Sequence, residues 1–325
     1  MSKYKSINIL TEELNKLNLH FAEDIKELVP LLDLLEKLNP CSQEYELIES
    51  NIIVSYSLKL NLLNFRNIFP LKADVQIIGL PVSVCLSGYF GHECAVQKII
   101  EQRKGLKVIL NGDSPFKGRG KTLSTFVFEN RFSSFDEYLN TLRSSYRRRI
   151  NKSLRQRENL TIKKLKRQDF SVKHYRLYLS IMNRTENLLE TLPIEFFQEY
   201  EAELYEFLDK DTNEPIGFIQ LKEIRDKLYF LFGGFKKEDN EAYDIYYNML
   251  LKIIEIGIEK GVKDIEFGQT AEESKLKIGC KEKYKYLYIH HSNNLLNFLI
   301  QLLVPLFTYE TYSVKHHVFK HEDKV

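Results

Sequence analysis

The feature that most constrains the fold is a repeated order of segments with strand and helix patterns. Residues 215–235 have the pattern of a β-hairpin, residues 242–261 carry the apolar stripe of a helix that stops at a glycine, and residues 262–270 form a strand that ends at Gly268. The same order of a helix, a glycine stop and a strand occurs at residues 92–113. A strand–helix–strand unit closes as a parallel pair, whereas a hairpin is antiparallel, so each half predicts a mixed sheet.

The sequence therefore predicts an α/β protein of two similar lobes, each a mixed sheet with a β-α-β crossover. Its 325 residues are enough for two domains of ordinary size. We expect an N-terminal lobe with leading helices at residues 1–125, a basic joining helix and strand at residues 126–167, and a C-terminal lobe with an apolar tail at residues 168–325.

The overall composition points to an ordinary globular protein. The formal net charge is +2, so any electrostatic attraction to a partner must be local. The four cysteines form no C-x-x-C pair and have no histidine at metal-ligand spacing, which predicts reduced thiols and no metal site. The chain starts without the apolar core of a signal peptide, and no apolar stretch is long enough to span a membrane. These features predict a cytoplasmic location.

Residues 294–307 are the one segment that qualifies this expectation, because they are almost entirely apolar. Pro305 interrupts the segment, and it is too short to span a bilayer. It could cover the core, wall a binding site for a long acyl chain, or make a shallow contact with a membrane surface. A peripheral membrane contact is therefore kept among the expected partners.

Positive charge is concentrated in one part of the chain. The stretch from Arg143 to Arg167 contains eleven lysines and arginines, and Glu158 is its only acidic residue. Apolar periodicity predicts one helix across residues 133–157, and the Ser-x-x-Glu spacing at residues 134–137 predicts a capping box at its start.

The basic face of this predicted helix lacks acidic partners one turn away. It is therefore either a solvated surface or a binding site for an anion, and the phosphates of a nucleotide-bearing thioester, a tRNA or an acidic lipid surface all qualify. Arg147 and Arg148 are the donor-binding candidates on this face.

A second candidate for donor binding follows the predicted hairpin. The strand is expected to end at Gly233 and Gly234, which would let the backbone approach a ligand, and Lys236 and Lys237 would assist. The alternative is an ordinary loop with Asn240 as the N-cap of the next helix, where nearby acidic residues complement the helix dipole.

The strand that ends at Gly268 leads into a short polar segment with a single notable lysine. Thr270 and Glu273 have capping-box spacing, which predicts a helix that holds Lys275 in its second turn and stops at Gly279. Ligands of open α/β sheets bind at the carboxyl ends of the strands. Lys275 is therefore either a surface charge on a connecting helix or a cation directed at a bound ligand.

These residues resemble a known family. The pattern of Phe267, Gly268, Thr270, Lys275 and Gly279 is similar to the second lobe of Fem-type proteins, which are tandem members of the Gcn5-related acyltransferase (GNAT) fold. The basic joining helix also resembles the helix that connects the two lobes in that family.

The resemblance covers about residues 125–290, and the first lobe matches only in the order of its elements. It implies N-acylation, in which an amine attacks an activated carbonyl, with Lys275 held near the reacting carbonyl. A preorganised cation would stabilise the oxyanion of such a reaction. A general base is also required, and Glu266 is the nearest candidate along the chain, with Tyr229 and Tyr284 as others.

Two departures from the family bear on the donor. Residues 236–240 lack the glycine-rich loop with which single-lobe acetyltransferases wrap the pyrophosphate of coenzyme A, and no helical arm of the kind seen in some tRNA-using relatives follows Arg157. We therefore expect an acyl-CoA or an acyl carrier protein as co-substrate, no permanently bound cofactor, and a small-molecule or peptide amine as acceptor. Transfer from an aminoacyl-tRNA and a non-catalytic module that binds nucleic acid, another anion or membrane remain the alternatives.

Overall fold

The computed structural model describes residues 2–16, 25–39, 41–61, 72–82, 84–116, 119–184, 190–310 and 314–320. The chain divides into two compact units. Unit 1 comprises Met1–Ser124 and Tyr284–Thr311, and unit 2 comprises Thr125–Lys283 and Tyr312–Val325. Two of the points at which the chain passes from one unit to the other lie in strands, one in β7 (Arg119–Glu129) and one in β13 (Lys281–His291).

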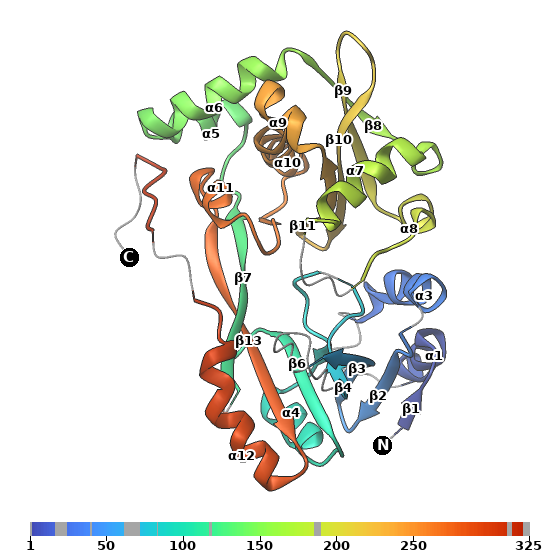
Figure 1. The fold of residues 1–325 in the computed structure, drawn as a ribbon. Helices are drawn as coiled ribbons and strands as arrows, with labels where there is room; N and C mark the ends of the chain where they lie inside the picture. The colour runs from blue at the N-terminus through green and yellow to red at the C-terminus, as the bar shows by residue number, and fades with distance from the viewer. Residues whose placement is uncertain are drawn as a thin grey trace. The chain divides into compact units, whose positions relative to one another are not determined.

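Unit 1 is built on strands in the order β1-β2-β3-β4-β6-β13, with β5 beside β3. Its other elements are β1 (Ser2–Tyr4), α1 (Ile7–Lys16), α3 (Val29–Leu38), β2 (Glu44–Ile48), β3 (Asn51–Asn61), β4 (Lys72–Ile78), β5 (Tyr89–Phe90), α4 (Glu93–Glu101), β6 (Leu106–Gly112), α12 (Asn294–Leu303) and the 3₁₀ helix η2 (Val304–Phe307), most of which are labelled in Figure 1. Strands β4 and β6 pair in parallel with α4 between them in the chain, whereas β2, β3 and β4 pair antiparallel. The mixed sheet predicted for the first lobe is confirmed.

Unit 2 has the strand order β7-β12-β11-β10-β9-β8. Its other elements are α5 (Phe135–Thr141), α6 (Ser144–Arg157), β8 (Leu160–Leu165), η1 (Arg167–Asp169), α7 (Val172–Met182), α8 (Ile194–Glu199), β9 (Glu203–Asp209), β10 (Pro215–Ile224), β11 (Lys227–Phe235), α9 (Lys237–Tyr243), α10 (Ile245–Lys260), β12 (Asp264–Glu266) and α11 (Glu272–Lys277). Strands β11 and β12 are parallel across α10, and β12 and β7 are antiparallel. This sheet is also mixed, as predicted.

Each unit completes its sheet with a strand from the other half of the sequence. The end of β7, which follows β6 in the chain, pairs with β12, and β13, which follows α11, pairs with β6. The structure therefore groups residues 284–311 with unit 1, in contrast to the single C-terminal lobe predicted at residues 168–325. The exchange depends on backbone pairing between distant strands, which local sequence patterns do not reveal.

The predicted basic helix is two helices rather than one. Helix α5 ends before Leu142, whose backbone is extended, and α6 begins at Ser144. The interruption occurs because the C-terminal segment takes up the backbone there: the N–H of Arg143 donates to the carbonyl of Val318 at 2.9 Å. Half of the predicted capping box is confirmed, since the Ser134 hydroxyl accepts from the N–H of Glu137 at 3.1 Å.

The expectation that β11 ends at its two glycines is wrong. The strand continues to Phe235, and both glycines pair with β10. A Cβ atom on Gly234 would lie 2.5 Å from the carbonyl carbon of Leu177 in α7, and one on Gly233 would lie 2.8 Å from the end of Met249 in α10. Successive residues of a strand face opposite sides of a sheet, so the two glycines allow helices to pack closely on both faces of unit 2.

We expect Gly234→Ala to lower the free energy of unfolding by about 2 kcal/mol or more, because the added methyl group meets helix backbone that cannot rotate away. Chemical denaturation of the purified variant measures this loss. Gly79→Ala is the matched control, since the nearest atoms to its Cβ lie at 3.5 Å or beyond. Equal stability of the two variants would contradict the packing role of Gly234.

Candidate functional site

The candidate site lies at the carboxyl end of β12, where the chain turns into α11. The backbone φ angles of Gly268, Thr270 and Ala271 are +71°, +64° and +50°, so three residues of the turn are left-handed. The capping box predicted here is absent, because Ala271 occupies the N-cap of α11 and Thr270 is part of the tight turn. The predicted stop is confirmed at Gly279, which has a φ of +99°. This turn is strained for non-glycine residues and must be held by the surrounding structure.

Lys275 is the residue that holds the turn. Its side chain is only 2% exposed, and its ammonium group donates to the carbonyls of Gly268 at 3.0 Å and Gln269 at 2.6 Å. The ammonium also lies 5.6 Å from the centroid of the Phe126 ring. The alternative of a surface charge is therefore wrong, and the structure places this cation beneath the turn in contact with its backbone.

Glu266 is the last residue of β12. The hydroxyl of Thr125, which is buried, donates to its carboxylate. Both Glu266 and Lys275 are close enough to Cys280 to influence its thiol, with Lys275 favouring the thiolate and Glu266 opposing it. Burial outweighs both and raises the pKa of the Cys280 thiol far above its usual value, so this cysteine is not a nucleophile.

The structure brings Tyr229 next to Glu266. The two residues pair across the parallel strands β11 and β12, so their side chains leave the same face of the sheet. Both are partly exposed. Tyr284, the remaining candidate base, belongs to unit 1, where the ammonium of Lys121 lies 4.0 Å from the centroid of its ring.

The two parallel strands separate directly after this pair. Their paired residues run from Lys227–Asp264 to Tyr229–Glu266. Strand β11 then continues to Phe235. The chain after Glu266 instead bonds to β7, through the N–H of Phe267. At the same place β11 has a bulge against β10, which leaves Leu231 outside the register. A bulge redirects side chains and backbone groups and commonly occurs beside active sites.

A residue missed by sequence reasoning lies at this bulge. Gln220 of β10 is fully buried, and neither atom of its side-chain amide has a hydrogen-bond partner in the described part of the chain. An unsatisfied buried amide costs about 1–3 kcal/mol. The only signal in the sequence is a polar residue inside an apolar strand. The position of this amide beside a bulge, which points to a site, is seen only in the structure.

The predicted donor-binding loop is a short helix. Lys236 is the N-cap of α9 and is exposed, as is Lys237. The first turn of α9 carries Glu238 and Asp239, which repel an anion at that end. Packed helices fill the space beside Gly233 and Gly234. These two glycines and the two lysines therefore do not form the open binding site that the sequence predicts.

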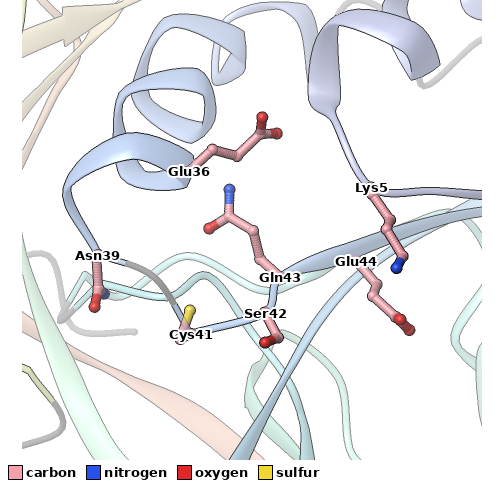
Figure 2. A pocket seen from close by; sticks show the side chains of 7 residues that line it. All are labelled: Lys5, Glu36, Asn39, Cys41, Ser42, Gln43 and Glu44. Carbon is pink, nitrogen blue, oxygen red and sulfur yellow. The ribbon is translucent and has the colours of Figure 1, made fainter.

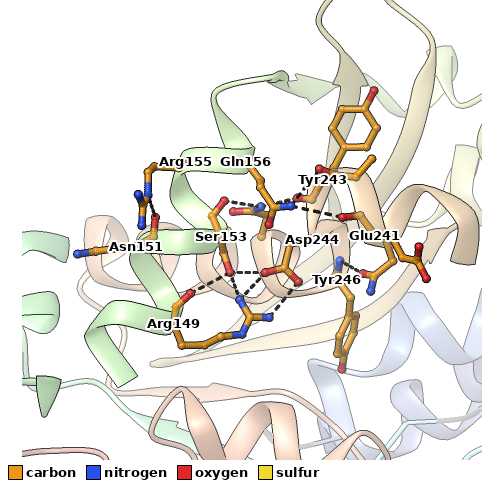
Figure 3. A network of polar contacts seen from close by, with 12 residues as sticks. Arg149, Asn151, Ser153, Arg155, Gln156, Glu241, Tyr243, Asp244 and Tyr246 are labelled. Atoms are coloured by element: carbon orange, nitrogen blue, oxygen red, sulfur yellow. Dashed lines mark hydrogen bonds and ion pairs between the residues drawn. The ribbon is translucent and has the colours of Figure 1, made fainter. Parts of the chain in front are cut away.

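Helix α6 is fixed by a polar network with the junction of α9 and α10, shown in Figure 3. The Arg149 guanidinium forms a bidentate ion pair with Asp244, a left-handed residue at which the predicted long helix is broken. Ser153 donates to the same carboxylate, and the Asn248 amide donates to the carbonyls of Ser153 at 3.0 Å and Tyr243 at 2.8 Å. The network orients α6 and thereby fixes which of its side chains face outward.

The outward side of α6 carries a stripe of cations, which we call the basic stripe: Arg148, Lys152 and Arg155. All three are exposed at helical spacing, and half-buried Arg147 lies beside them. Arg157, also predicted to be on the basic face, is instead neutralised by a bidentate pair with Glu255 of α10. Within the described ranges, no ion pair involves any member of the stripe, so its charge is available to an anion.

Two further features bear on where a site could lie. Unit 1 has a pocket of about 340 Å³, shown in Figure 2 and lined by Lys5, Glu36, Asn39, Cys41, Ser42, Gln43 and Glu44. Its lining mixes both signs of charge, and the Glu36 carboxylate in it accepts from the N–H of Ile7 at 2.6 Å. Over the residues that the structure describes, no group of three or more His, Cys, Asp or Glu side chains is placed to hold a metal ion.

Known proteins resemble this chain in structure but not in sequence. No protein-family model and no curated protein matches it. The C-terminal domain of a putative lysylphosphatidylglycerol synthetase from Agrobacterium fabrum aligns with a TM-score of 0.52 and 11% identity over 88% of this chain and 97% of that one. L-PGS from Bacillus licheniformis aligns with a TM-score of 0.52 and 11% identity over 94% and 98%, and FemX with 0.52 and 12% over 93% and 100%. The chain therefore has a Fem/GNAT-like fold.

Proposed function

We propose that the protein transfers an acyl group from an activated thioester, an acyl-CoA or an acyl carrier protein, to an amine. The observation that carries the proposal is the pairing of Glu266 and Tyr229 at the point where β11 and β12 separate. The Glu266 carboxylate, oriented by the buried hydroxyl of Thr125, can serve as a base. Strand β11 continues beyond the end of β12, and its backbone groups could bind an extended donor. The shared fold with FemX and the lysylphosphatidylglycerol synthetases supports transfer chemistry by analogy.

The proposed reaction forms a carbon–nitrogen bond and breaks the carbon–sulfur bond of the donor. Glu266 accepts a proton from the attacking amine, and the Thr125 hydroxyl keeps its carboxylate in place. The departing thiolate takes up a proton, for which the Tyr229 phenol is the proposed source. The amide of Gln220 is proposed to bind a polar group of the donor at the bulge.

Lys275 acts in this proposal as a positioning residue. Because it donates to both Gly268 and Gln269, its charge shapes the turn whose backbone borders Glu266. The field of its ammonium also favours negative charge at the reacting carbonyl. The family resemblance implies a lysine held near the reacting carbonyl, and the proposed hold on the turn is a second role for the same side chain.

The basic stripe favours a donor that carries phosphates. Coenzyme A, the prosthetic group of a carrier protein and tRNA all do, so aminoacyl-tRNA is the second candidate donor, and the stripe is the observation in its favour. Arg147 and Arg148 keep their proposed place in donor binding, whereas Lys236 and Lys237 are proposed only as secondary contacts.

Native mass spectrometry of the purified protein tests the class of donor. We expect a co-purifying acyl-CoA or acylated carrier protein, and transfer to a primary amine from that donor that is insensitive to ribonuclease. Activity lost on ribonuclease treatment would assign the tRNA alternative. Salt-dependent nucleic-acid binding without transfer from any donor would instead identify a non-catalytic binding module.

Neutralising the basic stripe is expected to weaken donor binding. For Arg148→Gln combined with Lys152→Gln, the slope of log affinity against log salt for a phosphate-bearing donor should fall by about 2, because two phosphate contacts are lost. Isothermal titration at several salt concentrations measures the slope. Lys227→Gln with Lys263→Gln is the charge-matched control, since these lysines pair with Asp264 and Asp226. Equal slopes for the two pairs would remove the stripe from donor binding.

A further inference from the structure

The helix α12 of unit 1 is built with its polar side turned toward the protein. The side chain of Asn297 accepts from the N–H of His291 at 3.0 Å, and the Gln301 amide donates to the carbonyl of Ile289 at 2.8 Å. One turn further on, Val304 is buried. The polar side chains, which a surface helix normally turns toward the solvent, therefore face the protein in α12 and anchor it to strand β13.

The opposite side of this segment is exposed and apolar, and we call it the apolar face. Its members are Leu295, Leu296, Phe298, Leu299, Leu302, Leu303 and Leu306. Phe298 and Leu302 are each 61% exposed, and Leu306 is 78% exposed. Contiguous apolar patches of more than a few hundred Å² on soluble proteins mark sites of protein or membrane interaction. Residues 294–307 include no charged residue, so no ion pair can select a protein partner through this face.

The size and shape of the apolar face favour a lipid surface over a second copy of the chain. A helix of ten residues is about 15 Å long and about 10 Å wide, so one side offers a few hundred Å². A stable dimer buries roughly 800 Å² per partner. The apolar positions also spread over nearly half of the helix circumference, wider than the seam that one partner helix covers. A fluid lipid interface covers such a convex stripe entirely.

We infer that α12 and η2 form an interfacial anchor that lies in the surface of a lipid bilayer, with the apolar face among the acyl chains. Because the segment is uncharged, its binding depends on the buried apolar surface and requires no anionic lipid. In the described parts of the chain, no helix is long and apolar enough to cross a membrane. The inferred contact is therefore shallow and parallel to the surface.

A single introduced tryptophan tests the anchor directly, because the chain contains no tryptophan. In Phe298→Trp, we expect a blue shift of the emission on addition of phosphatidylcholine vesicles and quenching by brominated lipid. Ile9→Trp is the matched control, since Ile9 is a 53% exposed apolar residue on helix α1 of the same unit. Its emission should not change.

Phe298→Glu combined with Leu302→Glu should lower vesicle partitioning at least about tenfold, with an unchanged melting temperature because both side chains face outward. Ile9→Glu should bind as the unaltered protein does. The inference is overturned if the protein fails to bind vesicles. It is equally overturned if binding requires phosphatidylglycerol, disappears with salt and is insensitive to the double substitution, or if light scattering shows a dimer that the double substitution dissociates.

Discussion

Replacing Glu266 by Gln is expected to lower turnover at least about a hundredfold, with little change in stability. General-base catalysis contributes about 10²- to 10⁴-fold, and the amide keeps the size of the carboxylate and a hydrogen bond with Thr125. The rate of amide formation from the identified donor measures the effect. Amines of lower pKa are less protonated at the assay pH and depend less on a base, so the loss of rate in Glu266→Gln should be smaller with them.

The matched control is Asp264→Asn, two residues earlier on the same strand. Asp264 leaves the same face of β12 and pairs with Lys227 at 3.4 Å, at the far end of the strand from the turn. We expect this variant to keep its activity within a factor of about two, because a partly exposed ion pair contributes little. Loss of activity in both variants would show that charge on the strand, and not a base at Glu266, is required.

Lys275→Ala is expected to cost about 3 kcal/mol of stability as well as activity. The substitution leaves two carbonyl groups of the turn without their buried donor and opens a cavity beneath it. Lys275→Met restores most of the volume without the hydrogen bonds, so it should recover part of the stability and none of the activity. Urea denaturation and turnover of the folded fraction, measured together, separate these effects.

The control for Lys275 is Lys277→Ala in the same short helix. Lys277 pairs with Glu273 one turn away and is partly exposed, so its loss should change stability by no more than about 0.5 kcal/mol. If Lys275→Ala were as stable as the unaltered protein but inactive, Lys275 would contact the reacting groups instead of holding the turn.

Much of the architecture was predictable because it depends on local periodicity. The apolar stripe of α10, the glycine stop after it and the alternation in β10 and β11 all correspond to elements of unit 2. The parallel pairing of β11 with β12 follows from the helix between them. The sequence singles out Lys275 because this lysine follows a buried strand and a tight turn. The structure places its ammonium against the backbone of that turn.

The prediction was less successful where distant segments interact. The junction of α5 and α6 requires Val318, whose carbonyl accepts from Arg143. The loss of Arg157 from the basic face requires Glu255, which is 98 residues further along the chain. The same reason explains why Gly233 and Gly234 were assigned to a ligand: the sequence shows the freedom of a glycine but not the helix that fills the space beside it.

By itself, the sequence determined two mixed sheets with a crossover helix, a concentration of cations near residue 150 and a short uncharged apolar segment near the C-terminus. These properties arise from neighbours in the chain, where side-chain periodicity and backbone preference act directly. Only the tertiary structure decided that Lys275 is buried beneath its turn, that Glu266 stands beside Tyr229 where two strands part, and that α12 turns its apolar face outward. Each of these depends on hydrogen bonds and packing between segments far apart in the chain, and local propensity carries no information about such partners.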